Sequence, residues 1–373
     1  MRLQRTKRFI ISGGGTGGHI FPAIAIANAI KELDPSSEIL FVGAKGKMEM
    51  EKVPAAGYRI EGLWISGIQR KLTLDNLAFP FKLISSLWKS RRIIKKFKPD
   101  AVIGVGGFAS GPLLYEATAL KIPTLIQEQN SYPGITNRIL AKRVKRICVA
   151  YEGMESYFPS DRILFTGNPV RKDILSLEGK RDEAFRFFGL EPGRTTVLIV
   201  GGSQGALSIN RCILNNIEKL DDSGLQVLWQ TGKSFYEQAR VVIENQNIKH
   251  IKVFDFIPKM DLAYSVGDIV VSRAGASAVS ELALVKKPCI LIPFPFAAED
   301  HQTKNASALV QKEAAILITD KKVEEDLVPE LLKLASDQNA QQKLKNNISG
   351  LGMPDSAIVI AKEIFKLAGY HAA

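Results

Sequence analysis

The chain has 373 residues, of which 46% are hydrophobic and 24% charged, as in a globular protein of two or three domains. Its three cysteines are odd in number and form no CxxC pair, which disfavours a disulfide framework or a zinc site and favours reduced thiols in a cytoplasm. The basic N-terminus precedes only a short apolar stretch at 9–11, whereas a secretory signal needs about 7–15 apolar residues and a membrane span roughly 18–20. We expect neither.

The net charge of +12 is distributed unevenly along the chain. Residues 1–170 hold 25 Lys and Arg against 13 Asp and Glu, whereas residues 171–373 hold 25 of each. A basic half attracts an anionic partner such as nucleic acid, acidic lipid or a phosphorylated substrate. A solvated basic face without any partner is the alternative that charge alone leaves open.

Strand, turn and helix alternate along the chain and then start again. In the first half, strands are expected at 8–12, 38–42, 100–105, 123–127 and 146–149, and the first is followed by a helix at 20–33. In the second half, strands are expected at 196–200, 226–229, 252–256, 268–272 and 288–292, with a helix at 206–220. This alternation predicts two Rossmann-like domains with parallel sheets. We place them at 1–168 and 169–354, with a C-terminal helical segment at 355–373 that can pack back on the first domain.

Three glycine-containing turns each follow a strand and open a helix: the first glycine turn (13–18), the second (201–205) and the third turn (273–278). The N–H groups of a helix N-terminus and close backbone approach at glycine favour an anion, usually phosphate. Any one of them could be only a tight turn. The first also fits GxGxxG, but the second strand ends in Gly43-Ala44-Lys45 without the acidic residue that binds a dinucleotide ribose. Walker A, HExxH and GxSxG are absent.

Further motifs occur in one order along nearly the whole chain. They are GGTGGH (14–19), GGFASGP (106–112), EQN (128–130), GITN (134–137), GNPVR (167–171), GGSQG (201–205), RAGAS (273–277) with Glu281, and DHQ (300–302) before Asn305 and Ala306. In this order they resemble the MurG family of N-acetylglucosaminyltransferases, which convert lipid I to lipid II in bacterial peptidoglycan synthesis. The family often has His where this chain has Gln127.

The resemblance implies an α/β fold of two Rossmann-like domains (the GT-B architecture) with the active site in the interdomain cleft. It implies inverting transfer of N-acetylglucosamine from UDP-N-acetylglucosamine to undecaprenyl-diphosphate-linked N-acetylmuramoyl-pentapeptide, without cofactor or metal. Diphosphate contacts are implied for Arg171, Ser203, Ala276 and Ser277, a ribose contact for Glu281, a uracil contact for the Ile257 backbone, and sugar contacts for Asn130 and Gln302. Each of these residues could instead have a structural role. Arg171 could form an interdomain salt bridge, Glu281 could be a helix surface charge, and Asn130 and Gln302 could be buried structural amides.

The first glycine turn is expected to serve the acceptor through Thr16, Gly17 and Gly18, with His19 at its edge as the candidate catalytic base. A neutral imidazole can take the proton of the attacking hydroxyl near pH 7. His19 could instead hydrogen-bond the acceptor diphosphate or cap the helix, and Glu128 is the rival base.

Residues 82–98 carry seven Lys and Arg and no acidic residue, interleaved with aromatic and aliphatic side chains. Such a basic amphipathic segment can lie in the headgroup region of an anionic membrane. We expect contacts there from Phe81, Trp88, Arg91, Arg92 and Lys95, although a helix packed on the core with a solvated basic side is the alternative. A second basic cluster can extend the same face: Arg138, Lys142, Arg143, Lys145 and Arg146.

The expected location is peripheral, on the cytoplasmic face of the cell membrane. The expected partners are UDP-N-acetylglucosamine, lipid I, the anionic membrane surface and proteins of cell-wall synthesis, with no nucleic acid because no such motif is visible. Two alternatives remain: another UDP-sugar enzyme of the same fold, such as a UDP-N-acetylglucosamine 2-epimerase, and a non-enzymatic membrane-surface nucleotide-binding protein.

Overall fold

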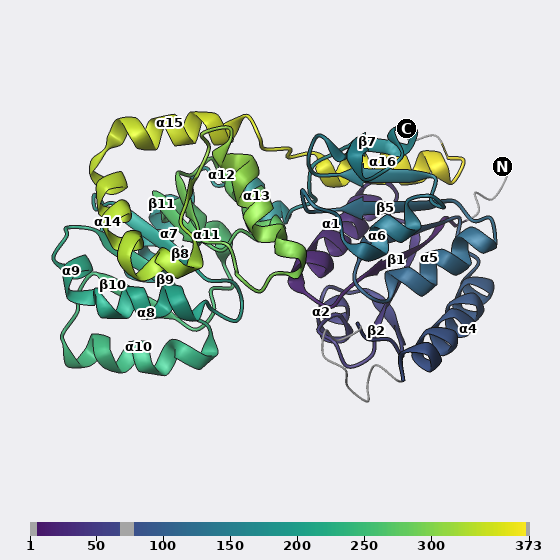
Figure 1. Ribbon diagram of the computed structural model, residues 1–373, viewed down its shortest axis with the longest axis horizontal. Coiled ribbons are helices and arrows are strands. Elements are labelled where there is room, and N and C mark those ends of the chain that lie inside the picture. The colour runs from purple at the N-terminus through teal and green to yellow at the C-terminus, as the bar shows by residue number, and fades with distance from the viewer. Residues whose placement is uncertain (1–5, 68–77, 371–373) are drawn as a thin grey trace. The chain divides into compact units, whose positions relative to one another are not determined.

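The computed structural model describes residues 6–67 and 78–370 (Figure 1). The described residues form two compact units. The first comprises those up to Arg171 together with those from Met353 onward, and the second is Lys172–Gly352. Each unit is an open, wholly parallel sheet with helices on its faces, which confirms the predicted α/β class and the two parallel-sheet domains.

The sheet of the first unit has the strand order β3-β2-β1-β4-β5-β6-β7. Its strands are β1 (Arg8–Gly13), β2 (Glu38–Ala44), β3 (Arg59–Leu63), β4 (Ala101–Gly106), β5 (Thr124–Glu128), β6 (Arg146–Val149) and β7 (Ile163–Phe165). Its helices are α1 (Gly17–Leu33), α2 (Glu49–Ala55), α4 (Phe79–Phe97), α5 (Ser110–Ala119), α6 (Ile135–Leu140) and α16 (Ser356–Leu367).

Alternation along the buried strands assigns the helices of this unit to two faces. Phe9 and Ile11 of β1 point to the layer of α1 and α16, whereas Ile10 points to the layer of α4 and α5. The last helix is part of the core, because the Phe365 ring meets the Phe9 ring edge to face at 5.3 Å. The chain therefore returns from the second unit to complete the first.

The sheet of the second unit has the order β10-β9-β8-β11-β12-β13. Its strands are β8 (Thr196–Val200), β9 (Gln226–Gln230), β10 (Ile251–Phe254), β11 (Ile269–Ser272), β12 (Cys289–Leu291) and β13 (Ile316–Leu317). Its helices are α7 (Arg181–Phe188), α8 (Leu207–Asn215), α9 (Ile217–Asp221), α10 (Lys233–Asn245), α11 (Met260–Val266), α12 (Ala276–Val285), α13 (His301–Val310), α14 (Val323–Ser336) and α15 (Gln338–Ser349).

Three predicted details are wrong. The helix expected at 206–220 is two helices, because Asn216 leaves the helical conformation (φ −116°, ψ 21°) and its side-chain amide donates to the Cys212 carbonyl. The strand expected at 252–256 ends at Phe254, where the Asp255 carboxylate accepts from the Phe256 N–H at 2.7 Å. The edge strands β3, β7 and β13 are not predicted: β7 and β13 have only three and two residues, and β3 alternates apolar residues with Glu61 and Gly62.

Strand order identifies where each sheet can bind a ligand. Both sheets reverse their winding direction, between β1 and β4 in the first unit and between β8 and β11 in the second. In open α/β sheets, ligands bind outside the carboxyl ends of the strands at such switch points. The first glycine turn follows β1, the second follows β8 and the third turn follows β11, so all three lie at switch points.

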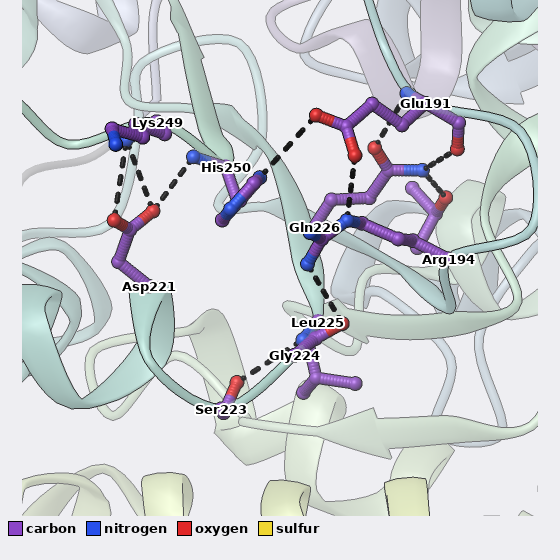
Figure 2. Close-up of polar contacts among 10 residues, drawn as sticks. Glu191, Arg194, Asp221, Ser223, Gly224, Leu225, Gln226, Lys249 and His250 are labelled. Carbon is purple, nitrogen blue, oxygen red and sulfur yellow. Dashed lines mark hydrogen bonds and ion pairs between the residues drawn. The ribbon is translucent and has the colours of Figure 1, made fainter.

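The opposite, amino edge of the second sheet is satisfied internally (Figure 2). The Asp221 carboxylate accepts from the backbone N–H of Lys249 at 3.1 Å and of His250 at 2.6 Å. The Gln226 side chain both accepts from the Glu191 N–H and donates to the Glu191 carbonyl at 2.9 Å. These polar groups satisfy one another's hydrogen bonds, so we assign this edge of the sheet a structural role.

Candidate active site

The third turn presents a buried hydroxyl at the start of α12. Ala276 is the first residue of that helix, and Gly275 before it has extended backbone (φ −66°, ψ 148°). The Ser277 Oγ is buried, and no described residue gives it a hydrogen-bond partner. A buried hydroxyl without a partner costs free energy, and a ligand oxygen at this helix N-terminus would satisfy it.

Arg273 joins the loops around this turn. Its guanidinium donates to the Asp320 carboxylate at 2.6 Å, to the Ser208 hydroxyl at 3.1 Å and to the carbonyls of Ile292 and Pro293. These partners come from α8, the segment after β12 and the turn before α14. Because Arg is planar with fixed donors, it sets the relative positions of these loops within the unit. Its place in the RAGAS motif is therefore structural, a role that the sequence did not predict.

The second glycine turn is held by a glutamine that the sequence did not single out. The Gln230 side chain donates to the Gly202 carbonyl at 3.0 Å and accepts from the Ile257 N–H at 2.8 Å. Ser203 lies on the exposed part of the turn. The closing glycine, Gly205 (φ 77°), contacts the backbone of Thr231, so its missing Cβ serves packing. Gln230 thus links the predicted diphosphate turn to the predicted uracil-reading residue.

Glu281 and Gln302 are both engaged within the second unit. The Tyr264 hydroxyl donates to the Glu281 carboxylate at 2.9 Å, one helix away on α11. The Gln302 side-chain oxygen accepts from the Phe294 N–H at 2.9 Å, which orients its amide nitrogen. Glu281 lies on α12, the helix on which the sequence places it, and Gln302 lies on α13. A ligand must share or replace these contacts.

In the first unit, the first glycine turn positions His19. Thr16 is the N-cap of α1, and Gly17 and Gly18 form its first turn. The His19 Nδ1 lies 3.0 Å from the Gly14 carbonyl oxygen. Because a carbonyl can only accept, Nδ1 carries the proton and Nε2 holds the lone pair. The imidazole also packs on Gly106 at the end of β4, where a Cβ would lie 2.5 Å from the ring.

Glu49 changes the interpretation of that turn. Its carboxylate is 1% exposed and accepts from the Gly15 N–H and the Ala44 N–H, each at 2.9 Å. Gly14 has no Cβ because the carboxylate occupies that space. The predicted anion cradle is therefore partly wrong: one of its N–H groups binds the protein's own anion. A dinucleotide phosphate at this position would also be repelled.

Glu128 lies at the carboxyl end of β5 and is 2% exposed. One carboxylate oxygen accepts from the Asn130 N–H and side-chain amide, and the other from the Gly134 N–H at 3.1 Å and the Asn137 side-chain amide at 2.8 Å. Four donors on two oxygens favour a role in shaping the loop to α6. The same bonds turn the Asn130 amide toward Glu128.

Arg171 and the three cysteines differ in their exposure to solvent. Arg171 is half-buried at the last position of the first unit's main segment. All three cysteines are free and buried, and burial raises the pKa of the Cys212 and Cys289 thiols to about 12. These thiols stay protonated and are unsuited to act as nucleophiles.

Sequence comparison shows what the chain is similar to. The Glycosyltransferase family 28 N-terminal domain matches residues 9–149, and the Glycosyltransferase family 28 C-terminal domain matches residues 196–359. A relative from Cytophaga hutchinsonii, named UDP-N-acetylglucosamine–N-acetylmuramyl-(pentapeptide) pyrophosphoryl-undecaprenol N-acetylglucosamine transferase, is 57% identical over 98% of each chain. A relative of the same name from Phocaeicola vulgatus is 52% identical over 98% of each chain.

Solved structures agree with this similarity. MurG of Acinetobacter baumannii is 28% identical, with a TM-score of 0.78 over 96% of this chain and 99% of that one. A UDP-N-acetylglucosamine 2-epimerase has a TM-score of 0.67 over 99% of this chain and 97% of that one. Its identity of 12% shows a shared fold alone.

The buried Ser277 hydroxyl yields a prediction with opposite effects on stability and binding. Ser277→Ala should leave the free energy of unfolding unchanged or raise it, because it removes an unsatisfied polar group. It should weaken UDP binding about tenfold, the order expected for one hydrogen bond to a charged ligand. Urea unfolding and titration calorimetry measure the two quantities.

Ser265→Ala is the matched control, because the Ser265 hydroxyl donates to the Leu262 carbonyl at 2.8 Å. That variant should lose about 1 kcal/mol of stability and keep its UDP affinity. Unchanged UDP affinity in Ser277→Ala would remove Ser277 from the diphosphate site.

Proposed function

Because the chain belongs to glycosyltransferase family 28, and within it to the pyrophosphoryl-undecaprenol N-acetylglucosamine transferases, we infer its reaction. It transfers N-acetylglucosamine from UDP-N-acetylglucosamine to N-acetylmuramyl-pentapeptide on pyrophosphoryl-undecaprenol, giving lipid II and UDP. Identity of 57% across 98% of the chain carries this conclusion, since it covers both units and every motif. The predicted family and activity are confirmed.

One assay tests this function against both alternatives. The purified protein should release UDP from UDP-N-acetylglucosamine only when lipid I is present, with one disaccharide formed for each UDP. An epimerase would convert the nucleotide sugar without any acceptor. A binding protein would bind UDP and release nothing.

For the donor side we propose the residues that gather at the carboxyl edge of the second sheet. The Ser277 hydroxyl and the N-terminus of α12 at Ala276 face the diphosphate, with Ser203 on the neighbouring turn. Glu281 accepts from the ribose hydroxyls, sharing its carboxylate with Tyr264. The segment at Ile257 reads uracil with its carbonyl, because Gln230 already occupies its N–H.

Six further residues complete the proposal for the two substrates. Arg171 supplies a guanidinium whose planar fork suits phosphate oxygens. Gln302 and Asn130 contact the N-acetylglucosamine, and each already has its side-chain oxygen or amide oriented within its own unit. Thr16, Gly17 and Gly18 contact the acceptor beside His19. The acceptor-side residues belong to 1–168 with 355–373, and most donor-side residues belong to 169–354.

The transfer itself needs a base and a stabilised leaving group. The acceptor hydroxyl attacks the anomeric carbon, its proton passes to a base, and the bond from that carbon to the UDP oxygen breaks with its electron pair going to UDP. Hydrogen-bond donors preorganised around the diphosphate stabilise the charge that develops there. Direct displacement inverts the anomeric configuration.

His19 fits the role of base better than Glu128. The Gly14 carbonyl holds the Nδ1 proton, which leaves the Nε2 lone pair to accept the hydroxyl proton. Glu128 accepts four hydrogen bonds in the protein interior, so protonating it would break part of its loop. We therefore assign Glu128 to shaping the acceptor side and His19 to the proton transfer.

His19→Ala should lower turnover by about 10²–10⁴, the usual contribution of a general base. UDP affinity should survive, since the donor residues lie mainly in the other unit. The assay is lipid I-dependent UDP release at saturating acceptor, and calorimetry measures UDP binding. His250→Ala, at the structural edge in Figure 2, is the control and should keep its turnover. Near-normal turnover of His19→Ala would exclude it as the base.

For the membrane we propose the outer face of α4. Within the described part of the chain, no helix is both long and apolar enough to cross a bilayer. Phe81, Ile84 and Trp88 recur along one side of α4 at helical spacing and are between 66% and 70% exposed. Arg92 and Lys95 continue that side, and the Arg92 guanidinium lies 5.9 Å from the Trp88 ring centre. Aromatic and basic groups on one helical face suit an anionic lipid surface.

Three of the predicted basic residues in this segment make contacts within the protein, although Arg91 keeps 49% of its side chain exposed. Lys82 is buried and donates to the Ser66 hydroxyl at 3.2 Å, and Lys89 donates to the Gly62 carbonyl at 2.8 Å. Arg91 pairs with Glu116 of α5 at 3.3 Å. The opposite side of α4 packs on the core through Ile93 and Ile94. The lipid-facing set is therefore narrower than the sequence suggested.

Binding to vesicles with anionic lipid should weaken as salt rises, because exposed charges are screened over about 8–10 Å at physiological salt. Trp88→Ser combined with Arg92→Glu and Lys95→Glu should reduce vesicle binding at least tenfold, by losing apolar insertion and about 1 kcal/mol per cation. Sedimentation with phosphatidylglycerol vesicles measures this. Lys219→Glu with Lys333→Glu, on the second unit, is the charge control. Equal binding of the α4 variant and the wild type would exclude this face.

We propose the cytoplasmic face of the cell membrane as the location, because the three cysteines are free thiols and the acceptor named for the relatives is lipid-linked. Proteins that make or consume the lipid-linked sugars are the partners we propose.

A further inference from the structure

We propose that Glu49 is a positioning residue that acts on His19 through the single peptide group between Gly14 and Gly15. This inference rests on the proposed role of His19 as the base. The carboxylate accepts from the N–H of that peptide, and the carbonyl of the same peptide accepts from His19 Nδ1, at 2.9 and 3.0 Å. Carboxylate, peptide and imidazole thus form one hydrogen-bonded chain.

The location of Glu49 shows that the fold itself holds this series of hydrogen bonds in place. Glu49 opens α2, so the positive end of a short helix stabilises its charge. Its second oxygen accepts from the Ala44 N–H at the end of β2, which fixes the carboxylate on a strand of the sheet. Gly14 and Gly43 lack the side chain that would occupy its space. A buried carboxylate is retained at a cost unless it is hydrogen-bonded, and here both oxygens are.

The peptide group transmits the effect because it is conjugated. Donation of its N–H to an anion shifts electron density toward its carbonyl oxygen, and hydrogen bonds in series strengthen one another. The Gly14 oxygen becomes a better acceptor for the Nδ1 proton. That selects the tautomer with the lone pair on Nε2 and stabilises the imidazolium formed when His19 takes the hydroxyl proton.

Two neutral groups also lie beside the His19 ring. The Thr16 hydroxyl lies 3.5 Å from Nδ1 on the same turn, and the backbone of Gly106 packs against the ring from the end of β4. Of Thr16, Gly106 and Glu49, Glu49 is the one that carries a charge, and it reaches His19 through the Gly14–Gly15 peptide. Its negative charge favours the imidazolium form of His19.

The variant that tests this proposal is Glu49→Gln, which keeps the shape of the side chain and removes its charge. Turnover should fall about tenfold with the KM for UDP-N-acetylglucosamine unchanged, as for outer partners of a functional histidine. The acidic limb of the turnover–pH profile should move to lower pH by roughly one unit, because a lost negative charge makes the imidazolium less stable. A residue that only supports the fold would lower turnover without moving that limb.

Glu51→Gln is the matched control, since Glu51 lies on the same helix with an exposed side chain and contacts Lys52. It removes the same charge without touching the Gly14–Gly15 peptide, so its pH profile should match the wild type. If Glu49→Gln lowers turnover and leaves the acidic limb in place, the proposal is overturned and Glu49 is a structural latch.

A second measurement does not depend on whether a Glu49 variant folds, because it uses the wild-type protein. The chain has four histidines, so nitrogen-15 spectra of histidine-labelled wild-type protein resolve them, with His19 assigned by its loss in His19→Ala. We expect the neutral form of His19 to carry its proton on Nδ1. A proton on Nε2 would overturn the proposal. Absence of sugar transfer by the wild type would instead overturn the proposed function and leave the tautomer result standing.

Discussion

Both sheets are parallel throughout, and this constraint determines where the chemistry can lie. Parallel strands all end at one edge, and at a switch point the turns after two neighbouring strands diverge and leave room for a ligand. The first glycine turn and the Gly106 segment share such a point in the first unit, as do the second glycine turn and the third turn in the second. At the opposite edge of the second sheet, the residues drawn in Figure 2 pair their polar groups with one another.

The turns at these points differ in what satisfies their donors. In the first unit, Glu49 supplies a fixed internal anion, and the peptide it binds orients His19. In the second unit, the Ser277 hydroxyl has no partner among the described residues. The same strand–turn–helix arrangement thus has two forms. One turn binds an internal carboxylate and orients a histidine, and the other leaves a buried hydroxyl without a partner among the described residues. Glycine content alone does not distinguish them.

The sequence predicted what depends on local pattern. Buried strands, the glycine turns and the helix at the C-terminus follow from apolar spacing and turn residues, and the ordered motifs indicated the family. What it could not predict are contacts made by residues distant in the chain. Glu49 comes after β2 yet bonds the turn after β1, Gln230 bridges two loops, and Arg273 pairs with Asp320. Lys82 reads as one more surface cation and is buried, because helix phase rather than composition decides its direction.

The return of α16 has a consequence for synthesis of the protein. Ile360, Ile364 and Phe365 complete the core layer that contains β1 and α1, yet they leave the ribosome after the whole of the second unit. At about 5–20 residues per second, the first sheet waits roughly ten to forty seconds for its last helix. During that interval the α1 layer lacks the side chains that cover it, and exposed apolar surface on a nascent domain is prone to aggregation. The second unit is contiguous in the chain, so it has no such wait.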